Sequence, residues 1–524
     1  MLLELGHLPR LARAGYILAR EGVFANLDPD LLPPAAAPLV RLANLFARDG
    51  EGSGKSAGKA LVAALSQIGP SYVKLGQFLA TRPDVVGGEI ADALSELQDR
   101  MAPFGREKAV SIVEKSLGRK IDDVYTFFGE PVAAASVAQV HMARVRDGDG
   151  HEKQVAVKVL RPGVEAQFAR DLRAMYFAAR LGERYSSEGR RLRLIEVVDT
   201  LARTVKLETD FRLEAAAASE FAENVAKDPN IRAPHVDWDR TAHDVLTLEW
   251  IDGAPLSDIA RVAADGHDLK ALGAHVLQSF LRHAMRDGFF HADMHQGNLF
   301  VDKQGRLVAI DFGIMGRLGL KERRFLAEIL YGFITRDYRR VAEVHFEAGY
   351  VPPQHSVEEF AQALRAIGEP LHTINASDIS MARLLTLLFE VTALFDMRTR
   401  TELVLLQKTM VVAEGVARTL DPKLNIWKTA DPVVRTWIEE NLGPKAKLED
   451  AGKNIAELAR LASHLPQTLA QAETAIARVS RMADQGVDLS PQAIEAMAAS
   501  RRSTDARLLL GVAALLLLGA WLFR

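Results

Sequence analysis

The chain has 524 residues, 48% of them hydrophobic, which is enough apolar material for more than one packed unit. Its formal net charge of −3 gives no overall basic character, so the composition does not indicate nucleic-acid binding. The absence of cysteine excludes disulfide bonds, thiolate catalysis and cysteine-ligated metal centres, and it is compatible with a cytosolic body.

The N-terminal part shows no secretory signal, because residues 1–20 lack an uninterrupted apolar run. Gly52-Ser-Gly-Lys-Ser56 resembles the end of a phosphate-binding loop. However, Asp49 stands where the first glycine is required, and no apolar strand leads into the segment. We therefore interpret residues 52–56 as a flexible polar linker. No dinucleotide fingerprint of strand, Gly-x-Gly-x-x-Gly and helix occurs in the sequence, so no flavin or nicotinamide site is predicted.

A lysine-bearing strand and a glutamate-bearing helix are predicted in the middle of the chain. Residues 154–160 form an apolar run with a single lysine, Lys158, after a turn at 147–150. This run alone is a weak signal, because a core strand that ends in a snorkelling lysine has the same pattern. Residues 208–218 have strong helix propensity and offer Glu214 as a partner for Lys158.

The next strand and helix lead to the most specific motif. Residues 245–249 read as a strand, and the glycine at 253 marks a hinge between two lobes, with Glu249 as a predicted nucleotide contact. Apolar residues at helical spacing follow between 272 and 285, and Gly288 ends that helix. The loop then reads His291-Ala-Asp293-Met-His-Gln-Gly-Asn298. A hairpin of two short strands, 299–301 and 307–310, leads to Asp311-Phe-Gly313.

These pieces indicate the ATP site of a protein-kinase-like fold. The hairpin returns Asn298 and Asp311 to one edge of a cleft. Both are predicted Mg²⁺ ligands, because Mg²⁺ prefers hard oxygen donors that it shares with phosphates. Asp293 is predicted to orient the attacking hydroxyl or water. Lys158, paired with Glu214, is predicted to contact the α- and β-phosphates.

Two other interpretations of the loop are a polar surface loop and a metal cluster built from His291, Asp293 and His295. The order of helix, loop and hairpin favours the nucleotide site. The predicted fold class is α+β, with a bilobal kinase-like fold, an N-terminal helical extension, a helical C-terminal region and a C-terminal transmembrane helix.

Some parts of an ordinary protein kinase are missing. No glycine-rich loop precedes the lysine strand, and its place is taken by an alanine-rich segment whose Cβ atoms restrict the backbone. Ala292 occupies the usual arginine position, and no Ala-Pro-Glu follows Asp311. A helical pattern begins near residue 320, so no long activation segment offers a platform for a peptide. The residues of the alanine-rich segment predicted to bind the nucleotide are Ala133, Ala134, Ala135 and Ser136.

The sequence resembles the UbiB family of atypical kinases, bacterial relatives of the mitochondrial kinase-like proteins needed for coenzyme Q synthesis. The segment 69–84, with Lys74-Leu-Gly76-Gln77, is highly specific for this family, and the resemblance spans roughly residues 60 to 320. The residues that carry it are Lys74, Gly76, Gln77, Ala133 to Ser136, Lys158, Glu208, Asp210, Glu214, Asp293, Asn298 and Asp311.

The resemblance implies that Lys74 and Gln77 fold over the active site and face Glu208 and Asp210. Such an arrangement would occlude a protein substrate and leave ATP hydrolysis or small-molecule phosphorylation. From the residues alone, Lys74 would be an ordinary surface lysine, and Glu208 and Asp210 would lie on a solvated helix face.

The C-terminus carries an uncharged segment, residues 508–523, flanked by Arg507 and Arg524. Its 16 residues would cover about 24 Å as a helix, slightly less than the roughly 30 Å hydrocarbon layer. We predict a single membrane span, and the arginines before it would keep the body cytoplasmic. A short span is accommodated by a thinner bilayer or by pairing with a second copy of the chain. A homodimer is therefore one of two alternatives for this segment.

Five regions are predicted: a helical extension (1–120), an N-lobe (121–255), a C-lobe (256–440), amphipathic helices (441–505) and the span (506–524). The amphipathic helices either pack on the kinase body or touch lipid. Three function classes follow from the residues and the resemblance. They are a membrane-associated ATPase or atypical kinase of ubiquinone biosynthesis, a small-molecule phosphotransferase resembling aminoglycoside or choline kinases, and a nucleotide-binding scaffold.

The leading class implies ATP and Mg²⁺ as cofactors and a location at the bacterial inner membrane. Its expected partners are inner-membrane lipids, prenylated quinone precursors and other ubiquinone-biosynthesis proteins, with no nucleic acid.

Overall fold

The structure is a computed structural model, and it describes residues 8–26, 57–80, 86–95, 97, 101–373, 391, 394–397 and 401–443. The chain divides into two compact units, Met1–Ile438 and Glu439–Arg524, and the described residues belong almost entirely to the first. The predicted linker at 52–56, the amphipathic stretch from 444 onward and the predicted span at 506–524 lie outside the described residues.

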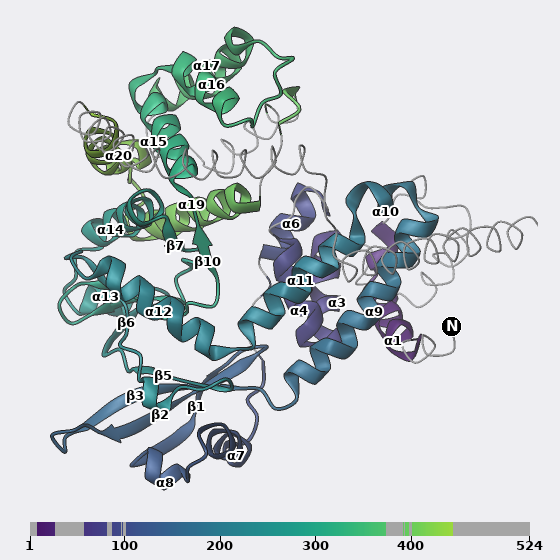
Figure 1. The fold of residues 1–524 in the computed structure, drawn as a ribbon, viewed down its shortest axis with the longest axis vertical. Coiled ribbons are helices and arrows are strands. Elements are labelled where there is room, and N and C mark those ends of the chain that lie inside the picture. The colour runs from purple at the N-terminus through teal and green to yellow at the C-terminus, as the bar shows by residue number, and fades with distance from the viewer. Residues whose placement is uncertain are drawn as a thin grey trace, which may run out of the picture. The chain divides into compact units, whose positions relative to one another are not determined.

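The first sheet holds the lysine-bearing strand (Figure 1). Its antiparallel order is β1 (Phe127–Ala134), β2 (Ala138–Arg146), β3 (Glu152–Leu160) and β5 (Val245–Glu249). Side chains alternate between the faces of a strand. The β3 residues Val155, Val157 and Val159 are buried against two helices, α7 (Arg106–Leu117) and α8 (Ile121–Val124). Lys158 therefore points to the other face of the sheet.

A second four-stranded sheet carries the hairpin predicted from the sequence. Its order is β4 (Ile231–Arg232), β9 (Leu307–Ala309), β8 (Leu299–Asp302) and β6 (Gly253–Pro255). Strands β8 and β9 are antiparallel, with Leu299 opposite Ala309. A two-stranded sheet of β7 (Phe289–His291) and β10 (Met315–Arg317) lies before and after this hairpin in sequence. The loop that holds Asp293 thus runs from β7 to β8.

Helices surround these strands and share the largest apolar core. Helix α14 (Leu269–Arg282) buries Leu272, Val276 and Phe280 in it, as their spacing predicts. A π-helical turn (His283–Asp287) follows, and Gly288, at φ 65°, ends it in the left-handed conformation that favours glycine. The other helices of this part are α13 (Ile259–Ala264), α15 (Leu320–Thr335), α16 (Tyr338–Glu347), α17 (Val357–Thr373), α19 (Thr401–Leu420) and α20 (Ile426–Leu442).

Two further groups of helices come from sequence regions before and after β3. The first group is α1 (Leu8–Arg20), the short 3₁₀ helix η2 (Val23–Asn26), α3 (Ala57–Ile68), α4 (Pro70–Leu79) and α6 (Gly88–Ser95). The second is α9 (Val164–Tyr185), α10 (Ser187–Leu192), α11 (Leu194–Glu208) and α12 (Phe211–Val225). Helix α4 contacts α3 and α6 as well as α9 and α11, so it joins the two groups (Figure 1).

The prediction of one helix over 208–218 is wrong. Helix α11 ends at Glu208, Thr209 is its C-cap, and Asp210 is the N-cap of α12. The Asp210 carboxylate accepts a hydrogen bond from the backbone N–H of Arg212, at 3.2 Å. Aspartate competes for backbone donors in this way and favours helix starts over helix interiors. Glu208 and Asp210 consequently do not share the face of one helix.

The mixed helix and sheet content and the order of the elements confirm the kinase-like part of the predicted fold class. None of the described helices combines the length and the apolar character that crossing a bilayer requires. The predicted C-terminal span remains a prediction, because it lies outside the described residues.

Candidate active site

Lys158 is the centre of a partly buried group of charges. Its Nζ donates to both carboxylate oxygens of Glu214, at 2.8 and 3.0 Å, and to Oδ2 of Asp311, at 3.3 Å. Glu214 lies in the first turn of α12, just after the Asp210 cap, and is 6% exposed. The contact between Lys158 and Glu214 that the sequence predicts is therefore present, and it draws in Asp311 from the end of the β8–β9 hairpin.

The pKa values in this group follow from burial and mutual attraction. Burial alone would lower the pKa of Lys158, but the charges of Asp311 and Glu214 hold it above its ordinary value, so the side chain stays an ammonium ion. Burial alone would raise the pKa of Asp311, but Lys158 and the Gly313 N–H hold it well below its usual range. Burial raises the pKa of Glu214, and Lys158 opposes that rise. The Lys158 ammonium ion thus lies beside the ionised carboxylate of Asp311.

The loop between β7 and β8 holds Asp293 by its own hydrogen bonds. The backbone N–H of Asp293 donates to Nδ1 of the buried His291, at 3.1 Å. Asn298 donates from Nδ2 to the carbonyl of Asp293, at 3.0 Å, and to its Oδ2, at 3.2 Å. The Asp293 side chain is 36% exposed, so its carboxylate is both positioned and accessible.

The hairpin brings Asn298 and Asp311 to the same edge. The backbone N–H of Ile310 donates to the carbonyl of Asn298, at 3.1 Å, which closes the hairpin at the residue before Asp311. Asp311 keeps its orientation because its Oδ1 accepts the N–H of Gly313, at 3.0 Å. An amide and a carboxylate side by side are hard oxygen donors of the kind that Mg²⁺ prefers. These two residues therefore fit a magnesium ion in the chemistry of their donors.

The alternative of a His-Asp-His metal cluster gains no support from the described residues. His291 is buried and uses Nδ1 for the Asp293 backbone, while His295 is half exposed, with its Nε2 3.6 Å from Asp293 Oδ2. The described side chains that do group as candidate metal ligands lie elsewhere: Asp147, Asp149 and His151 at a hairpin turn, and Glu165, His243 and Asp244. Neither group includes a residue of the Asp293 loop.

Lys74 reaches the same region from the N-terminal helices. Its Nζ lies 2.7 Å from Oε2 of Glu208, and the two side chains are 14% and 9% exposed. The charge of Lys74 also contributes to the low pKa of Asp311. Gln77 is half-buried one turn further along α4. Lys74 is thus a buried, paired lysine close enough to act electrostatically on Asp311.

Asp210 and Glu249 hold structural contacts in addition to any role at the site. Asp210 caps α12 and pairs with the Arg212 guanidinium, at 2.7 Å, which keeps the pKa of the carboxyl below its usual range. Glu249 Oε2 accepts from Arg232, at 2.9 Å, and from the backbone N–H of His235, at 3.1 Å.

The alanine-rich segment forms the end of β1 and the turn into β2. The Ala135 N–H donates to the carbonyl of Ala138, at 2.8 Å, and the Ala135 carbonyl accepts from Arg161, at 2.8 Å. The Ala134 carbonyl accepts the Met101 N–H, at 3.2 Å, and Ser136 is fully buried. A turn pinned in this way has fewer free amides for a phosphate than an open glycine-rich loop.

Contacts between helix α19 and the Asp293 loop were not foreseen from the sequence. The Thr409 hydroxyl lies 3.1 Å from the carbonyl of Ala292 and 2.8 Å from that of Leu405, so its one proton is shared between them, and Gln296 donates to the hydroxyl of Thr419, at 3.2 Å. More than a hundred positions separate these partners, and no motif at 409 or 419 marks them. Only the packing of α19 against α14 brings them together.

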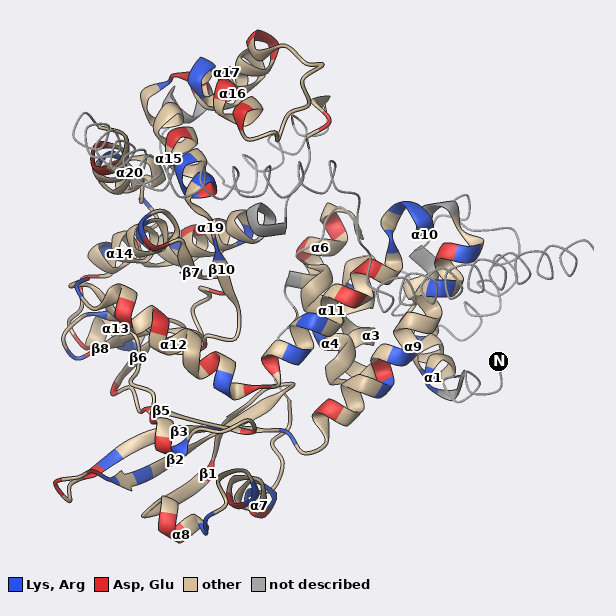
Figure 2. Cartoon of the chain, viewed as in Figure 1, with Lys and Arg blue, Asp and Glu red and all other residues tan. Residues whose placement is uncertain are grey.

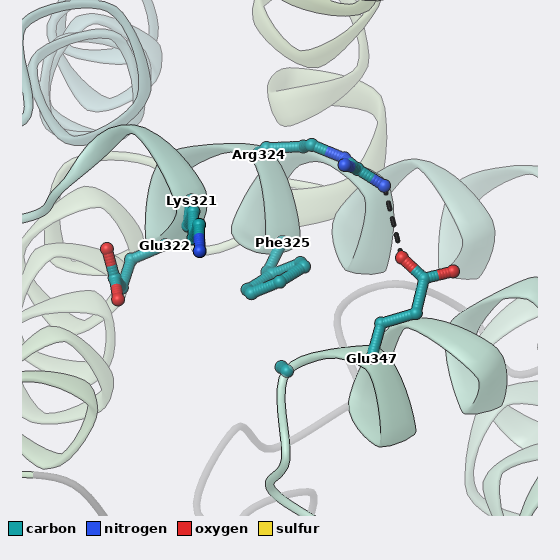
Figure 3. Close-up of a pocket in the computed structure, with 6 residues that line it drawn as sticks. Lys321, Glu322, Arg324, Phe325 and Glu347 are labelled. Carbon is teal, nitrogen blue, oxygen red and sulfur yellow. Dashed lines mark hydrogen bonds and ion pairs between the residues drawn. The ribbon is translucent and has the colours of Figure 1, made fainter. Parts of the chain in front are cut away.

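A separate hollow of about 350 Å³ lies where α15 meets the end of α16 (Figure 3). Lys321, Arg324, Phe325 and Glu347 line it, and Arg324 pairs with Glu347 at 3.1 Å. None of the predicted site residues lines this hollow. The hollow is therefore separate from the charged group around Lys158.

Comparisons with known proteins match about three quarters of the chain. Residues 96–345 match the model of the ABC1 atypical kinase-like domain, and residues 364–425 match the UbiB helical domain. A protein of Marinobacter nauticus named "Probable protein kinase UbiB" is 40% identical over 417 residues, covering 79% of this chain and 76% of that protein. A protein of the same name from Azotobacter vinelandii is 41% identical over 404 residues, covering 76% and 74%.

A solved structure of a Mycobacterium tuberculosis protein in complex with erythromycin is 24% identical in sequence. It covers 74% of this chain and 98% of its own, with a TM-score of 0.43.

Proposed function

The chain belongs to the UbiB family, and from this membership we propose that it is a membrane-associated atypical kinase or ATPase that supports ubiquinone biosynthesis. We propose further that it binds Mg-ATP and acts on, or gives access to, prenylated quinone precursors. The predicted C-terminal segment would hold the body on the cytoplasmic side of the bacterial inner membrane.

The observation that carries the proposal is the contact of Lys158 with both Glu214 and Asp311. Three elements far apart in sequence deliver these side chains: strand β3, helix α12 and the end of the β8–β9 hairpin. A half-buried lysine that is kept charged, next to a carboxylate that is kept ionised, supplies opposite charges for phosphate and for a cation. Asn298 stands beside Asp311 as the second oxygen donor for Mg²⁺, which would neutralise phosphate charge when bound.

Asp293 has the position for proton transfer. Its backbone is held by His291, its carboxylate is partly held by Asn298, and the remaining carboxylate surface is accessible. A hydroxyl group or a water molecule bound there would be oriented toward the phosphorus atom and would give its proton to Asp293.

An ordinary protein substrate is disfavoured by the short connection after Asp311. Helix α15 begins at Leu320, nine positions later, after the three-residue strand β10. The buried Lys74–Glu208 pair brings the N-terminal helices next to the same site. These two features support a small or membrane-bound acceptor, or water, rather than an extended peptide.

The test is the quinone profile, by mass spectrometry, of cells whose only copy carries Asp311→Asn at normal expression. We expect ubiquinone to be lost and a prenylated aromatic precursor to accumulate, because the neutral amide no longer supplies the charge that the site needs. The matched control is Asp265→Asn, an exposed residue that pairs only loosely with Arg261, at 3.9 Å. Its profile is expected to equal that of the wild type.

Two other outcomes would redirect the proposal. An unchanged profile for Asp311→Asn, with ubiquinone lowered by complete loss of the gene, would mean that the protein acts as a scaffold. An unchanged profile in both strains would remove the assignment to ubiquinone biosynthesis.

A further inference from the structure

We propose that Lys408, on helix α19, is a further catalytic residue of the phosphoryl-transfer site, whose ammonium group faces Asp293 and stabilises the transferring phosphoryl group on the acceptor side. The proposal rests on the proposed function. It assigns part of the chemistry to α19, which lies in the match to the UbiB helical domain and outside the match to the kinase-like domain.

Helix α19 is fixed against the Asp293 loop at two points. The Thr409 hydroxyl shares its proton between the carbonyl of Ala292, the residue before Asp293, at 3.1 Å and that of Leu405 at 2.8 Å, and the Thr419 hydroxyl accepts from Gln296. Thr409 is fully buried, so the first contact is part of the core. Lys408 precedes Thr409, and it lies eleven positions before Thr419, three turns of helix, on the same face. Lys408 is therefore on the side of α19 that meets the loop.

The charge of Lys408 is not used elsewhere among the described residues. Helix α19 carries few charged side chains (Figure 2), and its Glu414 and Arg418 pair with each other at 2.6 Å. The structure records no ion pair for Lys408 within its described part. The side chain is half-buried. Burial lowers the pKa of its ammonium group below the ordinary lysine value, and the negative charge of Asp293 opposes part of that fall. A desolvated cation without a paired carboxylate costs stability, so packing alone does not account for a lysine here.

The site also needs a positive charge at this position. Phosphoryl transfer spreads negative charge over the three equatorial oxygens of the phosphoryl group, and fixed cations stabilise it. Lys158 is held by two carboxylates, Lys74 is held by Glu208, and Ala292 replaces the usual arginine of the loop. Among the described cations that act on the Asp293 loop, Lys408 is the one left to meet the phosphoryl group from the acceptor side.

The step is a simple displacement. The acceptor oxygen, from water or from a substrate hydroxyl, forms a bond to the γ-phosphorus, and the bond from that phosphorus to the β–γ bridging oxygen breaks. The bridging oxygen leaves with ADP, and the acceptor proton moves to Asp293. Lys408 exchanges no atoms, and it holds the phosphoryl oxygens as their charge rises.

The experiment compares Lys408→Met, Lys408→Arg and Lys408→Gln in the full chain, reconstituted in lipid vesicles. ATP turnover, the affinity for Mg-ATP and thermal unfolding are measured for each variant. We expect kcat to fall about 100-fold for Met and Gln, as for other losses of one charge-stabilising group. Arginine should restore part of the loss. The affinity for Mg-ATP should change by less than about twofold, because the interaction is made in the transition state. The matched control is Lys270→Met, at an exposed position of α14.

Loss of folding is not expected for Lys408→Met, since replacing a half-buried, unpaired cation by an apolar chain is neutral or stabilising. A kcat for the Met and Gln variants equal to that of Lys270→Met would overturn the proposal. A fall in kcat that comes with a lower unfolding temperature and is not rescued by arginine would overturn it as well, because it would show a structural role. Wild-type protein that binds no nucleotide and turns over no ATP would overturn the proposed function and this proposal together. Normal ATP turnover by the wild type, with a kcat that the Lys408 substitutions leave unchanged, would overturn only the proposal for Lys408.

Discussion

His345 shows how burial alone can set the charge of one side chain. It lies on α16, 7% exposed, with its ring edge-on to Tyr350 and Phe360. Its Nδ1–H donates to the carbonyl of Val341, at 2.7 Å. Burial lowers the pKa of His345 from 6.5 to about 4, so the folded protein keeps the imidazole neutral at the acidities where an exposed histidine is already protonated.

This shift predicts a pH dependence of stability with a definite sign. Between pH 6.5 and about 4 the unfolded chain binds a proton that the folded chain rejects, so the stabilisation is complete above pH 6.5 and is lost on acidification. The loss is on the order of 3 kcal/mol over the whole window. In His345→Phe, which cannot titrate, the unfolding temperature should fall less between pH 6.5 and 4 than in the wild type. Parallel pH curves for the two proteins would contradict the prediction.

Lys158 illustrates what can be learned about a single residue before the fold is known. The apolar run around it predicts a strand, and the period of two places Lys158 opposite the buried valines. Its contact with Glu214 is predicted from the order of the pieces. Its contact with Asp311 is not, because no sequence pattern reports the distance between the ends of two elements that are 153 positions apart.

At the scale of elements, the junction between α11 and α12 positions two carboxylates differently. Glu208 ends α11 and pairs with Lys74, whereas Asp210 starts α12 and satisfies its first free N–H group. Because α12 carries Glu214 in its first turn, the cap supports the geometry of the Lys158 group.

Replacing the Asp210 cap should lower the free energy of unfolding by an amount that depends on the new side chain. Asp210→Ala should lower the free energy of unfolding by about 1 kcal/mol, whereas Asp210→Ser, which can also cap, should lose only a small part of it. Chemical denaturation followed by circular dichroism measures both. Equal losses for alanine and serine would show that the pairing of Asp210 with Arg212, not the cap, is what matters.

At the scale of the whole molecule, α4 joins the N-terminal helices to α9 and α11. One face of α4 presents Ser71, which donates to Asp171 at 2.6 Å, and Lys74, which pairs with Glu208. The other face presents Val73 and Gly76 to the apolar cluster around Leu65, Leu94 and Leu97. The glycine of the Lys-Leu-Gly-Gln motif is thus a packing requirement.

Gly76→Ala should therefore weaken this junction. The new Cβ would lie 2.8 Å from Cδ1 of Leu65 and closer still to Cδ1 of Leu97, which forces the leucines to move at a cost of about 1–3 kcal/mol. The variant should unfold at a lower temperature and should be cut faster by protease in the N-terminal helices. Gly15→Ala is the matched control, since no atom lies within 4 Å of its added Cβ and alanine favours a helix. Equal behaviour of the two variants would show that α4 tolerates a Cβ at position 76.

The sequence by itself determined the kinase-like fold, because the Asp293 to Asn298 loop, the hairpin and Asp311 are local in the chain and their spacing follows from strand and turn geometry. It also determined the family, through motifs such as Lys74 to Gln77. Helix ends that depend on a competing side-chain hydrogen bond are harder to predict from sequence. The break at Thr209–Asp210 is not predicted for that reason. Only the tertiary structure decided that Asp311 meets Lys158 and that α19 packs against the Asp293 loop. Each of these depends on the packing of distant elements, and packing leaves no periodic trace in the sequence.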